Sequence, residues 1–524
     1  MVEFPVAAMA STGIVVGVVL FLVLTTSIGL FSGLLVKKSS RRYMVAGKSM
    51  PLFIVGTMLA AAAVDGNGTL GAIGIGYDTG IWGGASIPIG ACICLFLIGL
   101  FYGAKLNRLS MLTLPDFYYR RYGPNTEFSA VLVMILGFVI MVAGNFAAAA
   151  FIFQAVFGIK YIWALLIGAA IVFIYTGSGG MFASAYTDIL QIYIAVIGLW
   201  AAFIYIAGGF TGHSFTSMWN AAPAHYTDMT GLTERSNGAL INWAGILSLA
   251  VGDIIALDFM ERVFSAKTPR IASRSAIWGG VITASVIVPV IFLAIFGRAL
   301  SPHLSSGYKS FPDIAIHHVP TVIGALMLAG VIGAAMSTSN SGMLALSSAI
   351  SRNVIQRNVI KRFLRRPTLG NRQLLLVTRL LLFPCAGFAI WWAYEIPQPG
   401  KYAILAFDIV LAGCFWPLTL GLFWHKANAW AAMASIVSGL GARLIGYIVT
   451  PSAWSGIETL LSPVVGGIFF VTVALLTQKQ NPGIDRWGTV EYIPPEEDII
   501  LGDDLRGYWA WDEARRSDEQ VVPV

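Results

Sequence analysis

Apolar residues occur along this chain in long runs that short polar loops separate. Most of these runs reach the length of about 18 residues at which an apolar stretch becomes a candidate membrane-spanning helix. We predict about 13 such spans, with limits that are good to a few residues. They lie near residues 11–35, 51–77, 81–104, 126–157, 161–177, 185–208, 239–262, 275–297, 321–351, 373–394, 402–424, 427–450 and 459–478.

The composition agrees with an all-α polytopic membrane protein. Of the 524 residues, 57% are hydrophobic and 11% are charged, whereas soluble domains contain about 25% charged residues. The mean hydropathy is +0.76. A net charge of +7 is also found in proteins that bind nucleic acid. Here the basic residues lie in short loops between apolar runs, so we expect the lipid bilayer as a partner and no nucleic acid.

The basic residues are distributed unequally between alternate loops. Roughly 21 fall in the loops after the first, third, seventh and ninth runs, against roughly 5 in the loops between these. Because cytoplasmic loops carry the excess of Lys and Arg, we predict an integral plasma (inner) membrane protein with its N-terminus outside and its C-terminus in the cytoplasm. An odd number of spans agrees with this orientation.

The second run is interrupted at its centre. Between Met58 and Ala72 the sequence reads MLAAAAVDGNGTLGA, which puts Asp65 at membrane depth. A carboxylate there costs about 2.5–3.5 kcal/mol and needs a partner, and each glycine weakens a helix by about 1 kcal/mol relative to alanine. We predict a spanning helix that breaks at its centre, where the freed carbonyls can hold a cation. The alternative is a glycine-rich packing helix with a hydrogen-bonded aspartate.

The seventh run contains a second polar interruption, five spans after the first. Gly245, Gly252 and Asp253 lie inside it. Inverted repeats of five helices place a broken helix at the start of each half, so the spacing predicts such a pair of repeats. Asp253 lies deep enough to contact a solute, whereas Glu261 and Arg262 are interpreted as the cytoplasmic end of the span.

These observations predict the following organisation of the chain. It comprises a first helix with a basic cytoplasmic loop (1–50), a first five-helix repeat (51–208), an extracellular loop (209–238), a second five-helix repeat (239–424), two additional helices (425–478) and a cytoplasmic tail (479–524).

The ninth run carries small and hydroxyl residues that can bind a cation. Sodium takes hard oxygen ligands, as calcium and magnesium do. The carbonyl of Ala334 and the hydroxyls of Ser337 and Thr338 would share one helical face, because positions i, i+3 and i+4 are neighbours. Carbonyls freed at the first break would complete a cage of oxygens. The alternative is that these small residues only allow helices to pack closely.

The sequence contains no motif that indicates an enzyme. We find no phosphate-binding loop, no pair of catalytic carboxylates and no cluster of metal-ligating side chains. We therefore expect no catalytic residues.

Five stretches resemble the sodium:solute symporter family, which includes the proline, pantothenate, choline, sialic acid and sugar symporters. They are Leu59–Gly68 (LAAAAVDGNG), Leu112–Gly123 (LTLPDFYYRRYG), Tyr175–Gln191 (YTGSGGMFASAYTDILQ), Asp258–Lys267 (DFMERVFSAK) and Ala334–Asn353 (AAMSTSNSGMLALSSAISRN). The resemblance implies a LeuT-like core of two inverted five-helix repeats. It also implies a sodium site between the first and eighth helices of that core.

The resemblance assigns roles to individual residues of the sodium site. By position, Ala63 and Gly66 would supply carbonyl ligands from one helix. Ala334, Ser337 and Thr338 would supply the ligands on the other helix.

Other positions bear on coupling and on the solute. Asp65 lies where the proline symporters have an aspartate needed for sodium coupling, and Asn67 lies where they have a solute-contacting serine. The choline branch places tryptophans in the first and sixth core helices, at positions that are Ala63 and about Ala256 here. Because choline recognition uses aromatic cages, these two positions argue against choline.

We therefore expect a secondary active transporter that couples sodium to the uptake of a small polar organic solute. An amino acid or related zwitterion is the favoured small-molecule solute, and a monocarboxylate is next. Asn67, Asn145, Trp243 and Asp253 are the candidate solute contacts. Two alternatives remain, which are a proton-coupled transporter that uses Asp65 and a membrane sensor built on a transporter fold. The sequence gives no expectation for the oligomeric state.

Overall fold

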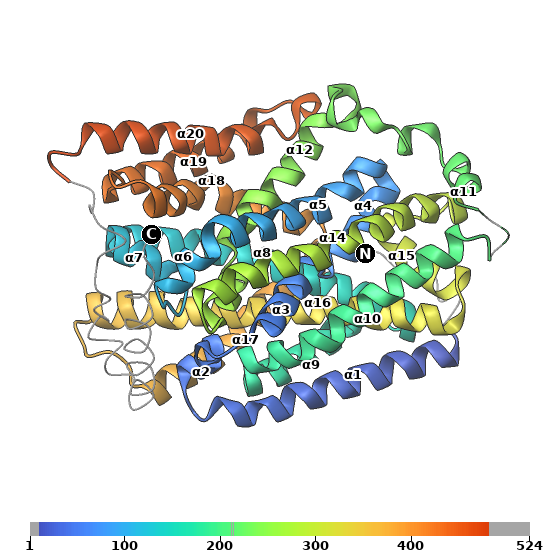
Figure 1. Ribbon diagram of the computed structural model, residues 1–524, viewed down its shortest axis with the longest axis horizontal. Helices are drawn as coiled ribbons and strands as arrows, with labels where there is room; N and C mark the ends of the chain where they lie inside the picture. Colours follow the sequence, from blue (N-terminus) through green and yellow to red (C-terminus); the bar gives the residue numbers. More distant parts are fainter. Residues whose placement is uncertain (1–9, 211, 213, 482–524) are drawn as a thin grey trace.

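Long helices run side by side along the longest axis of the molecule (Figure 1). The computed structural model describes residues 10–210, 212 and 214–481. Within this part of the chain, 11 helices are long and apolar enough to cross a membrane, and two bent helix pairs bring the number of spans to 13. The predicted number of spans is therefore confirmed. The predicted cytoplasmic tail lies almost entirely outside the described residues.

The continuous spans are built on eleven helices. They are α1 (Thr12–Ser32), α5 (Ile81–Leu97), α8 (Pro124–Phe157), α9 (Tyr161–Gly179), α10 (Met181–Ala207), α14 (Pro269–Leu300), α16 (Thr321–Ala349), α17 (Asn371–Glu395), α18 (Lys401–Phe423), α19 (Ala429–Val449) and α20 (Ile457–Leu476). Three of them continue into further helical segments. Helix α1 continues into the 3₁₀ turn η1 (Gly33–Val36), α5 into the π-helical turn η4 (Ile98–Tyr102) and the short helix α6 (Gly103–Arg108), and α16 into the π-helix η12 (Ile350–Phe363).

Shorter helices form the broken spans and the connections. The first broken span consists of α3 (Leu52–Ala63), η3 (Asn67–Gly71) and α4 (Ala72–Thr79), and the second of α12 (Ala239–Leu247), η8 (Ser248–Gly252), η9 (Asp253–Ile255) and α13 (Leu257–Ser265). The connections contain α2 (Ser40–Val45), η2 (Ala46–Lys48), α7 (Pro115–Tyr122), α11 (Phe215–Ala221), η5 (Ala224–Tyr226), η6 (Met229–Leu232), η7 (Arg235–Asn237), η10 (Gly307–Lys309), α15 (Ser310–Asp313), η11 (Ile314–His318) and η13 (Ser452–Trp454). Two isolated β-bridges complete the described structure.

Both predicted breaks are present. The axis turns by 43° between α3 and η3–α4, and by 46° between α12–η9 and α13. At the first break Val64 leaves the helical region (φ −101°, ψ 55°). At the second break Ala256 adopts an extended conformation (φ −60°, ψ 123°). In both cases the interruption adjoins polar and glycine residues inside an apolar run, as the sequence predicted.

Helix α16 occupies the centre of the molecule. Every residue from Met327 to Ala349 is buried, and the helix packs against α1, α3, α8, α10 and α13. Small residues allow this close packing. A Cβ atom added to Gly330 would lie 2.4 Å from the Cα of Ala195 on α10. The part of α16 that carries the predicted cation ligands is thus enclosed by protein on all sides.

Helices α18, α19 and α20 lie at the edge opposite α1 (Figure 1). The carboxylate of Asp408 on α18 forms an ion pair with Arg443 on α19 and accepts a hydrogen bond from the hydroxyl of Thr459 on α20 at 3.1 Å. Charges buried in a membrane span need partners. This group therefore holds the two last helices against α18.

Candidate cation and solute site

The side chain of Asp65 has two hydrogen-bond partners in the turn after the first break and one on α8. Its Oδ1 accepts the backbone N–H of Gly68 at 2.6 Å. Its Oδ2 accepts the side-chain amides of Asn145 on α8 at 2.7 Å and of Asn67 at 3.4 Å. The carboxylate therefore caps the turn that follows the break and ties this turn to α8.

Two predicted solute contacts, Asn67 and Asn145, lie beside Asp65 and take part in the same hydrogen bonds. The Oδ1 of Asn145 accepts the N–H of Gly66 at 3.0 Å. The Oδ1 of Asn67 accepts the N–H of Gly400 at 3.0 Å. Gly400 precedes α18 with φ +83°, a conformation that favours glycine. The side chain of Asn67 therefore connects the first broken helix to the loop before α18.

The first break lies directly against the serine-rich segment of α16. The hydroxyl of Thr338 donates to the carbonyl of Ala61 at 3.5 Å. A Cβ atom added to Gly66 would lie 2.6 Å from the Cβ of Ala335, closer than side chains approach each other, so glycine is required for this contact. The last turn of α3, which ends at Ala63, is therefore in contact with the Ala334–Thr338 segment. The end of a helix leaves backbone carbonyls without intrahelical partners.

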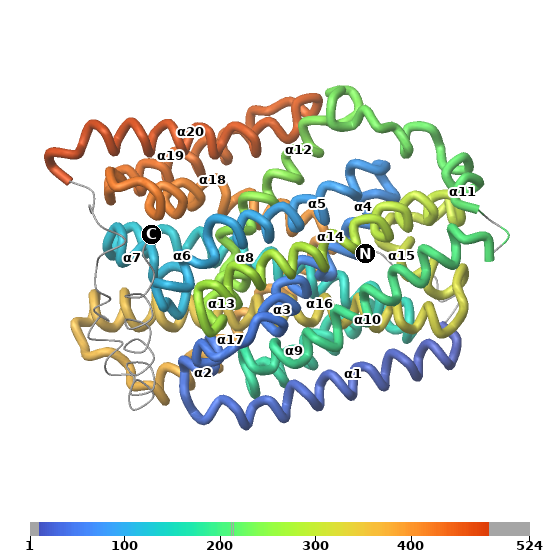
Figure 2. Tube along the Cα trace, viewed as in Figure 1, coloured from blue at the N-terminus to red at the C-terminus, as the bar shows by residue number. Residues whose placement is uncertain are grey.

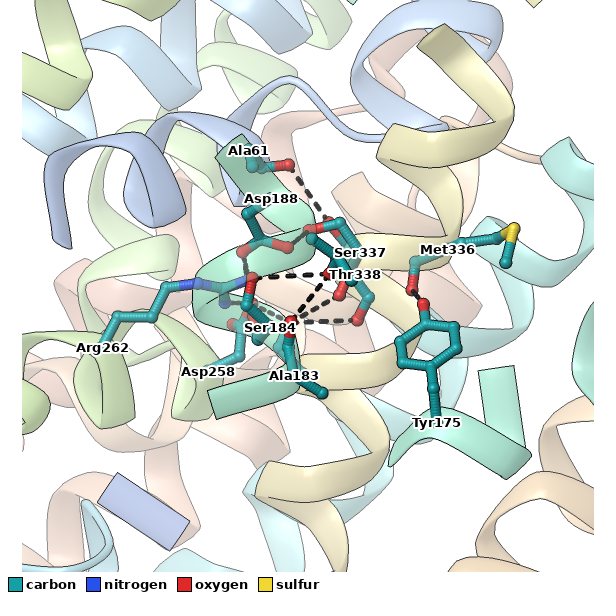
Figure 3. A network of polar contacts seen from close by, with 12 residues as sticks. Ala61, Tyr175, Ala183, Ser184, Asp188, Asp258, Arg262, Met336, Ser337 and Thr338 are labelled. Atoms are coloured by element: carbon teal, nitrogen blue, oxygen red, sulfur yellow. Dashed lines mark hydrogen bonds and ion pairs between the residues drawn. The ribbon is translucent and has the colours of Figure 1, made fainter. Parts of the chain in front are cut away.

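Ser337 belongs to a buried network of charges that reaches the second broken helix (Figure 3). Its hydroxyl donates to Oδ1 of Asp188 on α10 at 2.7 Å. The guanidinium of Arg262 on α13 contacts Oδ2 of Asp188 at 3.5 Å and Oδ2 of Asp258 at 2.7 Å. These side chains are 2% exposed or less. Arg262 therefore pairs with two carboxylates that would otherwise be buried without a counter-charge.

Two further serines complete this network. The hydroxyl of Ser184 donates to Oδ2 of Asp188 at 2.9 Å, and that of Ser341 donates to Oδ2 of Asp258 at 3.4 Å. The network thus joins α10, α13 and α16, whereas the cation residues of the first break join α3 to α16. Ser337 and Thr338 are adjacent, so the two groups meet on one turn of α16.

The donor set fits sodium. Within the described ranges, no group of three or more His, Cys, Asp or Glu side chains is gathered as a transition-metal site would need. A hydroxyl has one donor hydrogen and two acceptor lone pairs. The hydroxyl of Ser337 donates its hydrogen to Asp188, and that of Thr338 donates to the carbonyl of Ala61. The oxygen lone pairs of both hydroxyls therefore remain available to bind a hard cation.

The other two predicted solute contacts lie elsewhere. Asp253 is 2% exposed and lies in η9, immediately before the second break. Its carboxylate interacts electrostatically with Asp258 and Asp65, which places it near the first break. Trp243 is 46% exposed, and its indole N–H donates to the carbonyl of Leu232 in η6 at 3.0 Å. The structure therefore does not bring Trp243 to the Asp65 group.

Sequence reasoning missed Asp188 and the depth of Arg262. The predicted span begins at residue 185 and no role is assigned to Asp188, whereas α10 begins at Met181 and Asp188 lies buried inside it. Arg262 was assigned to the cytoplasmic end of its span but is fully buried. The available signal was the presence of unlike charges in two neighbouring spans, which a membrane interior tolerates only as pairs.

A family model described as the sodium:solute symporter family matches residues 43–439, which is most of the chain. The chain belongs to the sodium:solute symporter family. The symporter is accordingly a membrane transporter, and sodium is its coupling ion. The expected family is confirmed.

Curated relatives of this symporter carry different solutes in their names. It is 24% identical over 458 residues to the high affinity choline transporter 1 of Homo sapiens, covering 82% of this chain and 76% of that protein. It is 24% identical to the sodium/pantothenate symporter of Haemophilus influenzae, covering 77% and 83%. It is 23% identical to the sodium/glucose cotransporter of Vibrio parahaemolyticus, covering 77% and 79%. These identities leave the solute of this symporter open.

Solved structures show that the fold is LeuT-like. A substrate-bound, outward-open structure of a Na⁺-coupled sialic acid symporter superposes with a TM-score of 0.76 at 17% identity, covering 89% of this chain and 98% of that one. Mhp1, a nucleobase-cation-symport-1 family transporter in a closed conformation, gives a TM-score of 0.52 at 12% identity, covering 88% and 97%. The predicted fold class is therefore confirmed.

Proposed function

We propose that this symporter takes up an amino acid or a related zwitterion together with sodium. Sodium binds the carbonyls of Ala63 and Gly66 on the first broken helix. It also binds the carbonyl of Ala334 and the hydroxyls of Ser337 and Thr338 on α16. Asp65 holds the first break in shape and contributes negative charge nearby.

One observation carries the sodium part of this proposal. The break in the first span lies against α16 at Gly66–Ala335 and at Ala61–Thr338. Carbonyls of one helix and hydroxyls of another thus face each other inside the protein, where broken backbone at membrane depth is tolerated. A cation between them joins two elements that belong to different halves of the fold.

The solute part rests on the polar groups around the two breaks. Asn67 and Asn145 line the first break, and Asp253 precedes the second. Trp243 is left out of the proposed site because its indole binds the outer loop. The amide N–H groups of the asparagines can donate to a carboxylate, and the carboxylate of Asp253 can accept from an ammonium group. These groups therefore suit a solute that carries both.

Transport would proceed by alternating access, with the N-terminus outside and uptake directed into the cell. Sodium links α3 to α16, so its binding favours the arrangement in which these helices touch. A ligand can shift such an equilibrium only by its differential affinity for the two states. Ser337 also binds Asp188, and through Arg262 the second broken helix is in contact with the same turn of α16.

Uptake into proteoliposomes tests this proposal. Purified symporter is reconstituted and offered radiolabelled amino acids, short carboxylates, quaternary amines, nucleobases and sugars, each with an inward sodium or potassium gradient. We expect accumulation of an amino acid or related zwitterion with sodium alone. Accumulation driven by a proton gradient in the absence of sodium would contradict the proposal and favour a proton-coupled transporter.

A further inference from the structure

A buried carboxylate at the second break has no counter-charge. Asp253 is 2% exposed, and its Oδ1 is buried without a hydrogen bond from any residue that the structure describes. The hydroxyl oxygen of Ser248, in the preceding turn η8, is likewise buried without a hydrogen-bond partner. Buried polar groups are normally hydrogen-bonded, and an orphaned group needs an explanation. Two such groups in one broken helix are available to bind a ligand.

The surroundings of Asp253 are acidic. Its electrostatic neighbours are Asp258 and Asp65, and the thiol of Cys94 on α5 lies within the same range. Arg262 pairs with Asp258 and Asp188, and among the described residues no basic side chain forms an ion pair with Asp253 itself. An anion would be repelled here, and a cation would be stabilised, because carboxylates in a low-dielectric interior interact strongly with charge.

The charge balance of the whole centre points the same way. Five buried carboxylic acids lie on the two broken helices and on the facing helix α10, which are Asp65, Asp188, Asp253, Asp258 and Glu261. Arg262 pairs with Asp188 and Asp258. Arg262 and one bound sodium supply only two positive charges for these five acidic groups. A solute that brings a positive charge would reduce the remaining excess, and an anionic solute would increase it.

The position of Asp253 allows it to act in transport. It lies in the turn directly before the extended residue Ala256, and α13 beyond that residue packs against both α3 and α16 (Figure 2). Discontinuous helices form solute sites in transporters because their interrupted backbone lines the binding region. A solute bound to Asp253 would therefore be bound to the second broken helix, and it would move with that helix.

We propose that Asp253 is the counter-ion for a positively charged nitrogen of the solute. The carboxylate accepts hydrogen bonds from an amine that is protonated at neutral pH, and it excludes solutes whose only charge is a carboxylate. This inference rests on the proposed symport function and narrows its solute class. Within the proposed zwitterions, it assigns the ammonium end to the second break, and it removes monocarboxylates as solutes.

Thermal unfolding of the purified symporter with matched compounds tests this assignment. Ligands that bind the folded state raise the melting temperature. The probes are an amine, an amino acid and a carboxylate on one skeleton, in three sets. These are propylamine, β-alanine and propionate; pyrrolidine, proline and cyclopentanecarboxylate; and phenethylamine, phenylalanine and 3-phenylpropionate. Each is measured in sodium chloride and in potassium chloride of equal concentration.

We expect at least one amine-bearing compound to raise the melting temperature in sodium, and its matched carboxylate to have no effect. The Asp253→Asn variant should lose this amine-dependent rise while keeping the rise caused by sodium alone. The Asp253→Glu variant should keep the preference for amines. Asp408→Asn is the matched control, because it makes the same change at a buried carboxylate that already binds Arg443 and Thr459. It should keep the amine-dependent rise.

Three results would overturn the assignment. They are a rise with a carboxylate alone, no rise with any amine-bearing compound, and an amine-dependent rise that Asp253→Asn leaves unchanged. The wild-type comparison decides the charge preference even if the variant does not fold. The absence of any difference between sodium and potassium in the wild type would instead contradict the proposed symport function, so the two failures are distinguishable.

Discussion

The hydroxyl groups of Ser337 and Thr338 each donate one hydrogen bond and keep their lone pairs. Ser337 donates to a carboxylate and Thr338 donates to a backbone carbonyl. These bonds fix the orientation of both oxygens without consuming their capacity to bind sodium. Both hydroxyls can therefore act as sodium ligands, although Asp188 orients one of them and the carbonyl of Ala61 orients the other.

Replacement of Thr338 by valine removes a proposed sodium ligand while keeping the shape of the side chain. We expect the sodium concentration that gives half-maximal thermal stabilisation to rise about tenfold or more, which corresponds to about 1.4 kcal/mol. Ser339→Ala is the control, because the hydroxyl of Ser339 binds only the carbonyl of Ala335 in its own helix. Equal sodium titrations for both variants would argue against Thr338 as a ligand.

Gly66 is the point at which the first break touches two other helices. A Cβ atom there would lie 2.6 Å from the Cβ of Ala335 and 2.8 Å from the Cβ of Ala148. We expect Gly66→Ala to lower the stability by about 1–3 kcal/mol, the usual cost of overpacking a close contact. Gly387→Ala, where nothing lies within 4 Å of the added atom, should leave the melting temperature unchanged or raise it. A melting temperature that Gly66→Ala leaves unchanged would show that this contact can relax.

At the scale of residues, the sequence shows which side chains stand out chemically but not which residues they bind in the fold. Asp65 stands out because an acid and several glycines interrupt an apolar run, and its carboxylate indeed binds the turn after the break and a neighbouring helix. Two partners of Asp188, which are Arg262 and Ser337, come from segments more than 70 residues away, and no local pattern encodes such a distance. Trp243 has the residue type of a solute contact, but its indole binds the carbonyl of Leu232 in η6.

At the scale of elements, the packing of α13 depends on Arg262, whose positive charge compensates two buried carboxylates. Arg262 contacts Asp188 on α10 and Asp258 on its own helix. Breaking a buried pair by removing one partner costs about 3–5 kcal/mol, because the other charge stays buried without compensation. The loss of Arg262 leaves two such charges, whereas the loss of Asp188 still leaves Arg262 with Asp258.

We therefore expect Arg262→Met to be destabilised by at least about 3 kcal/mol and to be more destabilised than Asp188→Asn. Thermal unfolding and the yield of folded, monodisperse protein in detergent measure this difference. Asp188→Asn should also weaken sodium stabilisation, because the Ser337 hydroxyl then donates to a neutral amide oxygen, which is a weaker acceptor than the carboxylate that orients it. If Asp188→Asn is the less stable variant, Arg262 does not balance both carboxylates.

A second ionic group joins helix α7 to the end of the central span. The carboxylate of Asp116 contacts Arg352 at 3.0 Å and Arg357 at 3.0 Å. Burial opposes the charged form of Asp116, but the two guanidinium groups outweigh burial and hold its pKa below the ordinary value. Because the pKa is lower in the folded state, this carboxylate stabilises the fold fully above about pH 4 and loses that effect as the pH falls through the folded value.

We expect Asp116→Asn to be less stable than the wild type at pH 7 and to lose less stability on acidification to about pH 3. Melting temperatures across this range measure the effect. Glu395→Gln, which changes an exposed carboxylate at the end of α17, serves as the control. Parallel pH profiles for Asp116→Asn and the wild type would contradict the ionic role of Asp116.

Element limits are the part of the fold that the hydrophobic pattern predicts least well. Helix α14 begins at Pro269, several residues before the predicted start, because Thr268 caps it and a proline suits its first position. Helix α10 begins before the predicted residue 185 because its first turns are buried in spite of their polar residues. The centres of the spans and both breaks agree with the prediction, since burial in a membrane demands long apolar stretches there.

At the scale of the whole molecule, two features of the sequence predict the architecture. Thirteen apolar runs fix the number of spans, and two interruptions five spans apart fix the pattern of the repeat. The LeuT-like arrangement then places both breaks against α16 and its serines. The solute cannot be deduced in the same way, because relatives of similar identity carry choline, pantothenate and glucose in their names.

The binding of ²²Na⁺ to the purified symporter tests the central claim most directly. The claim is that the first break and α16 together hold the coupling ion. We predict saturable binding that excess unlabelled sodium displaces and excess potassium does not, with affinity reduced about tenfold or more in Thr338→Val and retained in Ser339→Ala. Binding of equal strength in wild type and Thr338→Val, or no saturable binding at all, would contradict the account.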